Sequence, residues 1–210
     1  MSAREQRLAE VIGAVAWQAL ADHGCARIAL PDDGSPEAAL AARLLGAMLG
    51  EDRLVRVAAD SAEVEPLLQT ATAEPERVAA EVRRLKARLL ADALPAGVEN
   101  KTALLLGGAL PPEPLLPLGD LYASEVAELT GGWSAPPAVR RLAELAGGVE
   151  QLDDALRARF DERDPAGLER LPEAARAPVR EALARGRTSR LYPRIVAKLG
   201  SRTLGIDLFE

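Results

Sequence analysis

The order of elements between residues 26 and 59 constrains the fold more than any other feature of the sequence. Apolar runs over 26–30 and 53–59 each predict a strand. Between them, Ser35 followed by Pro36 is typical of a capped helix start, and Gly50 predicts the end of that helix. Since a helical crossover joins parallel strands, we expect an open parallel α/β sheet.

Apolar residues at helical spacing predict further helices on both sides of this unit. The first starts at the capping-box pattern of Ser2 and Glu5 and stops at Gly24. The strongest pattern covers 74–94, and its apolar stripe is expected to be buried, with the arginines mostly off it. This stripe consists of Val78, Val82, Leu85, Leu89 and Ala93. In the helix after Ser35, the expected buried face consists of Leu40, Leu44, Leu45 and Met48.

Beyond residue 100 the sequence predicts mainly helices. They cover 101–106, 120–129, 136–146, 149–160 and 172–184, and a proline-rich loop covers 108–119. We expect one α/β domain over residues 1–210. It has a sheet-forming core over 1–130, a mainly helical part over 131–190 and a C-terminal tail over 191–210.

Composition excludes several classes of function. The net charge of −6 argues against a general nucleic-acid binder, which needs a basic surface. One cysteine and one histidine cannot form a disulfide framework or a Cys/His zinc site. Charged residues within 1–24 argue against a signal peptide, and no apolar run approaches the roughly 20 residues of a membrane span. We therefore expect a cytoplasmic protein with no membrane and no nucleic-acid partner.

Three segments in order resemble the ammonia-dependent NAD synthetase family. They are Gly97-Val98-Glu99-Asn100-Lys101-Thr102-Ala103, Pro117-Leu118-Gly119-Asp120-Leu121-Tyr122, and the run from Tyr192-Pro193 to Gly205-Ile206-Asp207. The resemblance implies a three-layer, Rossmann-like sheet of the adenine nucleotide α-hydrolase type, here truncated, and a homodimer. Active members are N-type ATP pyrophosphatases that adenylate deamido-NAD with Mg-ATP, after which ammonia displaces AMP.

The sequence departs from this family where the chemistry is expected. The family's Ser-Gly-Gly-x-Asp-Ser phosphate loop corresponds to 30–36, where Pro31 and Pro36 lack N–H donors and Asp32 and Asp33 add negative charge. The family's metal-binding Glu corresponds to Ala103. We therefore expect a catalytically inactive homologue retained as a binding or interaction module. The alternative is an active ATP-dependent amide ligase that converts deamido-NAD and ammonia to NAD.

Six side chains remain candidates for binding a nucleotide or another anion, and four of them have a simpler structural alternative. Ser35 and Asp120 each have helix capping as the alternative, and Lys101 a surface ion pair. For Lys198 the alternative is a solvated charge. The six are Ser35, Asn100, Lys101, Asp120, Arg190 and Lys198. The sequence assigns no catalytic residue and no metal ligand, and it implies ATP, Mg²⁺ and deamido-NAD as cofactors only if the family activity persists.

Overall fold

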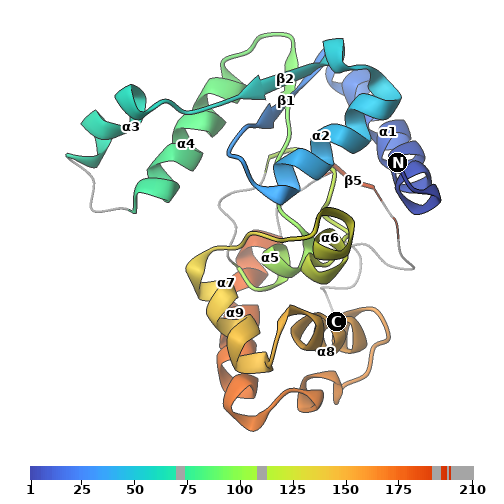
Figure 1. Cartoon of the computed structure of the whole chain (residues 1–210), viewed down its shortest axis with the longest axis vertical. Helices are drawn as coiled ribbons and strands as arrows, with labels where there is room; N and C mark the ends of the chain where they lie inside the picture. The colour runs from blue at the N-terminus through green and yellow to red at the C-terminus, as the bar shows by residue number, and fades with distance from the viewer. Residues whose placement is uncertain (70–73, 108–112, 191–194, 198, 200–210) are drawn as a thin grey trace.

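The computed structural model of the chain describes residues 1–69, 74–107, 113–190, 195–197 and 199, without the side chains of 187–190 (Figure 1). The central sheet contains β1 (Arg27–Pro31), β2 (Leu54–Val57) and β3 (Ala93–Pro95) in the order β2-β1-β3. Both pairings are parallel, with Ile28 opposite Leu54 on one side and Leu94 on the other. The predicted parallel α/β sheet is therefore confirmed.

Two short strands extend this arrangement. β4 (Leu115–Leu116) and β5 (Ile195–Val196) form a parallel pair. A single bridge between Ala96 and Leu115 links β4 to the end of β3. The strands therefore follow one another in the order β2-β1-β3-β4-β5, which is the order of flavodoxin-like doubly wound sheets.

Helices cover both faces of the central sheet, giving three layers (Figure 1). On one face, Ile28 and Leu30 share a buried core with α1 (Ala3–His23) and α2 (Pro36–Leu49). On the other face, Ala29 and Val57 pack with Ala87 of α4 (Pro75–Arg88), and α3 (Ser61–Leu68) lies beside α4. The alternating direction of β1 side chains thus supplies both cores, as expected for a strand buried on both faces.

Local signals set the ends of the first two helices. The Ser2 and Glu5 side chains form the predicted capping box at the start of α1, and Gly24 ends it in the left-handed conformation. Ser35 Oγ accepts the Ala38 N–H at the start of α2, and Pro36 occupies the first turn. A short 3-10 turn, Glu51–Arg53, then leads into β2.

The rest of the chain is mainly helical, as predicted. A second large core lies between α5 (Lys101–Leu105), α6 (Ala123–Thr130), α7 (Pro137–Ala146), α8 (Val149–Phe160), the 3-10 turn Gly167–Arg170 and α9 (Glu173–Arg190). Helix α9 extends beyond the predicted end at residue 184. Among the described residues, none of the helices has the length and apolar character needed to cross a membrane.

The prediction for residues 74–94 was wrong in two respects. The helix ends at Arg88, and 93–95 form β3 because their backbone groups pair with β1. The predicted apolar stripe is buried only in part, since Val78 and Ala93 are 8% and 5% exposed but Leu85 and Leu89 are 60% and 73% exposed. The sheet packs instead against small Ala87, and Arg84 is almost buried on that side.

Two smaller predictions were also wrong. Asp120 does not cap the helix that follows, because α6 begins one turn later with Tyr122 as its N-cap residue. Met48 is 41% exposed, whereas Leu49 is buried in its place. The Met48 side chain lies against Gly13 of α1.

Candidate functional site

The strand order places a candidate site between the carboxyl ends of β1 and β3. From β1 the chain crosses through α2 to β2 on one side, whereas β3 lies on the other side of β1. In open α/β sheets, ligands bind outside the carboxyl ends of the strands at such a switch point. Ser35 begins α2 after β1, and Asn100 begins α5 after β3. The fold thus brings these two predicted residues to the same edge of the sheet.

The loop after β1 uses its amide groups internally. The Asp32 N–H donates to Val57 O of β2 (2.9 Å), and the Ser35 N–H donates to the Asp33 carboxylate (2.9 Å). Pro31 and Pro36 have no N–H to donate. The loop therefore differs from a phosphate-binding loop, whose successive N–H groups converge on an anion.

A buried carboxylate lies in the first turn of α2. Glu37 is 2% exposed, and it accepts the Ser134 N–H (3.0 Å) and the Ser134 hydroxyl (2.6 Å). It also accepts a hydrogen bond from the Asn100 side-chain amide (3.2 Å), whose oxygen in turn accepts the Ala103 N–H (3.0 Å). The protein's own Glu37 carboxylate thus places a negative charge at the positive end of the α2 dipole.

Arginines of α4 lie over the same edge of the sheet and pair with acidic residues there. The Arg84 side chain is 9% exposed, and its Nε donates to Glu113 at 2.7 Å, while Glu99 lies 3.9 Å from it. Arg83 lies 3.9 Å from Asp33, and Arg88 lies 3.5 Å from Glu113. These cations are therefore largely neutralised by the protein's own carboxylates.

Lys101 and Asp120, both predicted candidates, form a buried ion pair with each other. Lys101 Nζ lies 3.2 Å from Asp120 and 2.7 Å from Asp161 of the loop after α8. The exposed side-chain fractions are 4% for Lys101 and 0% for Asp120. Asp120 also accepts the Leu199 N–H (2.8 Å). The surface ion pair that was the alternative for Lys101 is thus replaced by a buried one.

Tyr122, the N-cap residue of α6, also belongs to this cluster. Its hydroxyl donates to Asp161 (3.1 Å), and Lys101 Nζ and the Arg157 guanidinium lie 4.9 and 4.8 Å from the ring centroid. These distances allow cation–π attraction from both groups. Burial, reinforced by the negative charge of Asp161, raises the pKa of the Tyr122 phenol far above its usual range. The phenol therefore acts as a hydrogen-bond donor.

A second buried carboxylate, Asp153 of α8, joins the starts of α5 and α6. It accepts the Thr102 hydroxyl (2.6 Å) and the Ser124 N–H (2.7 Å), and the Thr102 oxygen accepts the Ala123 N–H (2.9 Å). Burial raises the pKa of Asp153, although these hydrogen bonds act in the opposite direction. Because every contact fixes one helix against another, this network serves to position α5, α6 and α8.

The last two predicted candidates fall at the end of the described chain. Arg190 is the final residue of α9, and its side chain lies outside the described part. Lys198 lies outside the described residues altogether. Neither residue can therefore be assigned to the site between β1 and β3.

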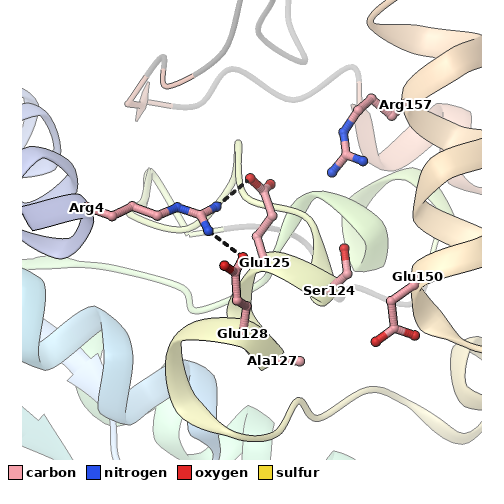
Figure 2. Close-up of a pocket in the computed structure, with 7 residues that line it drawn as sticks. All are labelled: Arg4, Ser124, Glu125, Ala127, Glu128, Glu150 and Arg157. Carbon is pink, nitrogen blue, oxygen red and sulfur yellow. Dashed lines mark hydrogen bonds and ion pairs between the residues drawn. The ribbon is translucent and has the colours of Figure 1, made fainter. Parts of the chain in front are cut away.

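A cavity of about 600 Å³ lies between the start of α1, α6 and α8 (Figure 2). Arg4 reaches across it to Glu125 (3.0 Å) and to Glu128. The lining residues are Arg4, Ser124, Glu125, Ala127, Glu128, Glu150 and Arg157. With three carboxylates against two guanidinium groups, this cavity does not favour a phosphate ligand.

Several residues that form these clusters are not among the six candidates predicted from the sequence. Glu37, Asp153 and Asp161 form the buried hydrogen bonds and ion pairs, yet each stands on a helix or loop where an exposed acid is common. The one signal in the sequence was the position of Glu37 in the first turn after Ser35 and Pro36, which indicates an interaction with the helix dipole. No group of three or more His, Cys, Asp or Glu side chains in the described part could hold a metal ion.

Neither a scan with protein-family models nor a search of curated proteins finds a match to the chain. Among solved structures, it is similar to the NH3-dependent NAD synthetase from Campylobacter jejuni subsp. jejuni NCTC 11168, determined in complex with the nitrate ion. The TM-score is 0.66 at 16% sequence identity, and the match covers 93% of this chain and 99% of that one. The chain therefore has the α/β fold of an NH3-dependent NAD synthetase.

Proposed function

We propose that this protein is an NAD synthetase-like scaffold that has lost amide-forming catalysis. In this proposal it acts in the cytoplasm as a homodimeric binding or interaction module. The observation that carries the proposal is that carboxylates of the chain itself lie at the start of α2. Asp33 accepts the Ser35 N–H, and Glu37 accepts three hydrogen bonds from Ser134 and Asn100.

This arrangement opposes the binding of a triphosphate. The start of a helix attracts an anion through its free N–H groups and its dipole, but here the protein supplies that anion. A phosphate about 4 Å from either carboxylate would be repelled by about 4 kcal/mol at an effective dielectric constant near 20. The residues present at the β1 edge therefore do not fit the phosphates of ATP.

The cations near the site do not compensate for this charge. Lys101 lies between Asp120 and Asp161, and Arg84 lies between Glu99 and Glu113. Phosphoryl and adenylyl transfer need positive groups that are directed at the reacting phosphate. Recruiting either cation would break its ion pair with a buried carboxylate, Asp120 or Glu113, which is costly.

The test combines turnover with ligand-induced stabilisation. The purified chain is incubated with Mg-ATP, deamido-NAD and ammonia, and NAD and AMP are measured; we expect neither product. In parallel, thermal unfolding is followed with Mg-ATP alone. A ligand at 100 times its Kd would stabilise the fold by about 2.7 kcal/mol, or roughly 5 °C or more for a chain of this size. We expect no such shift.

A double variant tests the effect of the two carboxylate charges. Asp33→Asn with Glu37→Gln removes both negative charges while keeping the side-chain shapes. If these charges exclude phosphate, Mg-ATP should stabilise the variant more than the natural chain. Formation of NAD and AMP by the natural chain would instead establish the alternative, an active amide ligase. Stabilisation of the natural chain by Mg-ATP without turnover would show that a nucleotide ligand is retained, and it would refute the argument from charge.

A further inference from the structure

The segment 131–136, which joins α6 to α7, lies across the first turn of α2 (Figure 1). Gly132 lies against α2, since a Cβ added to this glycine would be 3.7 Å from the Pro36 ring. Ser134 contacts Glu37 through both its N–H and its hydroxyl group. We call this segment the 131–136 strap. It reaches the edge of the sheet at which ligands bind in open α/β folds.

The two sides of the strap are attached by different interactions. Trp133 and Ala135 are partly buried against the second core, which is formed by the helices from α5 to α9. Between them, Ser134 contacts α2, where its N–H lies 3.0 Å and its hydroxyl 2.6 Å from the Glu37 carboxylate. Since the apolar contacts belong to the helical side, the attachment of the strap to α2 depends mainly on Glu37.

The Glu37 carboxylate occupies a site that other parts of the chain have built. Besides the two donors of Ser134, the side-chain amide of Asn100 donates to it at 3.2 Å. Asn100 is 2% exposed, and its oxygen accepts the Ala103 N–H, which fixes its NH₂ group toward Glu37. Hydrogen bonds to a charged acceptor are roughly twice as strong as neutral ones, and the dipole of α2 adds to them. These groups form a binding site for a carboxylate.

From this geometry we infer that Glu37 is an internal ligand that keeps the 131–136 strap closed over the edge of the sheet without any bound molecule. The strap detaches from α2 when the carboxylate is removed, because Ser134 then loses its acceptor there. A small free carboxylate can take the place of Glu37, since the donors come from Ser134 and Asn100. This inference goes beyond the proposed function, because it holds whether or not the chain binds a nucleotide.

The experiment empties the site and then refills it. Glu37→Ala removes the carboxylate, and hydrogen exchange of the Ser134 amide is followed by NMR in the full chain. We expect this amide to exchange about 10- to 100-fold faster, the change that corresponds to one hydrogen bond to a charged group. Sodium formate, which has the size of the deleted carboxylate, should slow the exchange again, whereas sodium chloride at the same concentration should not. The natural chain should show no formate effect.

Two further variants separate the strap from the stability of the whole fold. Ser134→Ala removes only the hydroxyl bond, so it should accelerate exchange of the amide at position 134 less than Glu37→Ala does. Formate should not reverse this effect, because Glu37 still fills the site. Glu144→Ala, which removes an exposed carboxylate of α7, is the matched control and should leave the exchange unchanged.

The amides of β1 supply the reference, because they exchange only when the sheet opens. We expect their rates to stay the same in Glu37→Ala and in Ser134→Ala. An unchanged rate at position 134 in Glu37→Ala, an equal acceleration in β1, or a formate effect no larger than that of chloride overturns the inference. Each of these results is independent of the turnover assay with Mg-ATP, deamido-NAD and ammonia.

Discussion

Replacing Lys101 by Met tests whether the buried cluster around it holds the fold together. Lys101 Nζ lies 3.2 Å from Asp120 and 2.7 Å from Asp161. At an effective dielectric constant near 20, these distances correspond to attractions of about 5 and about 6 kcal/mol. Each attraction is offset by the several kcal/mol needed to remove an ion from water, so the net value of the intact cluster is small.

Removing one partner of the cluster lowers the stability of the fold by more than this net value. Asp161 is 21% exposed and can regain water, but the Asp120 side chain has no exposed surface. Met has a similar length and leaves no large cavity, so the dominant effect is that the buried Asp120 carboxylate loses its ion pair with Lys101. Breaking a buried pair in this way costs about 3–5 kcal/mol. We expect Lys101→Met to lower the free energy of unfolding by that amount.

The assay is urea unfolding followed by circular dichroism, with linear extrapolation to water. The matched control is Lys86→Met, because Lys86 and Glu63 form a pair whose side chains are 38% and 37% exposed, and such surface pairs contribute about 1 kcal/mol or less. Adding Asp120→Asn to Lys101→Met should recover part of the loss, since it removes the buried negative charge that Lys101 faced. Equal losses for Lys101→Met and Lys86→Met would refute the reasoning.

Two further predictions concern Tyr122 and the glycines that end helical turns. Burial raises the pKa of Tyr122 above the value of about 10 that an unfolded chain has, so its contribution to stability is present below that pH and is lost as the pH rises further. Tyr122→Phe should therefore flatten the decline in unfolding free energy above pH 10, and an unchanged slope would contradict this. Gly107 has φ +72°, and an added Cβ would lie 2.8 Å from the Gly186 backbone, whereas Gly131 has φ +78° and nothing within 4 Å. Gly131→Ala should lower the free energy of unfolding by about 1 kcal/mol, from the backbone conformation alone. Gly107→Ala should lower it by about 3 kcal/mol, because overpacking is added. Urea unfolding measures both values, and equal losses would argue against the close approach at Gly107.

The sequence determined the elements whose signals are local. Ser2 with Glu5 and Ser35 with Pro36 set the starts of α1 and α2 through contacts within one turn. The two apolar runs around α2 required parallel pairing because a helix joins them. Helix α8 was predicted with its observed bounds for the same reason, since its apolar periodicity lies within a single segment.

The tertiary structure alone decided which groups meet. β3 has three residues, too few for a pattern, and it became a strand because β1 supplied its hydrogen bonds. Packing on the sheet likewise decided which side of α4 is buried near its C-terminal end, where Ala87 packs with β1 and Leu85 is exposed. Lys101 likewise gained Asp161 from 60 residues away, and Glu37 gained Ser134 from 97 residues away. Periodicity and capping depend on neighbours in the chain, whereas burial and charge pairing depend on distances in space that the order of residues does not contain.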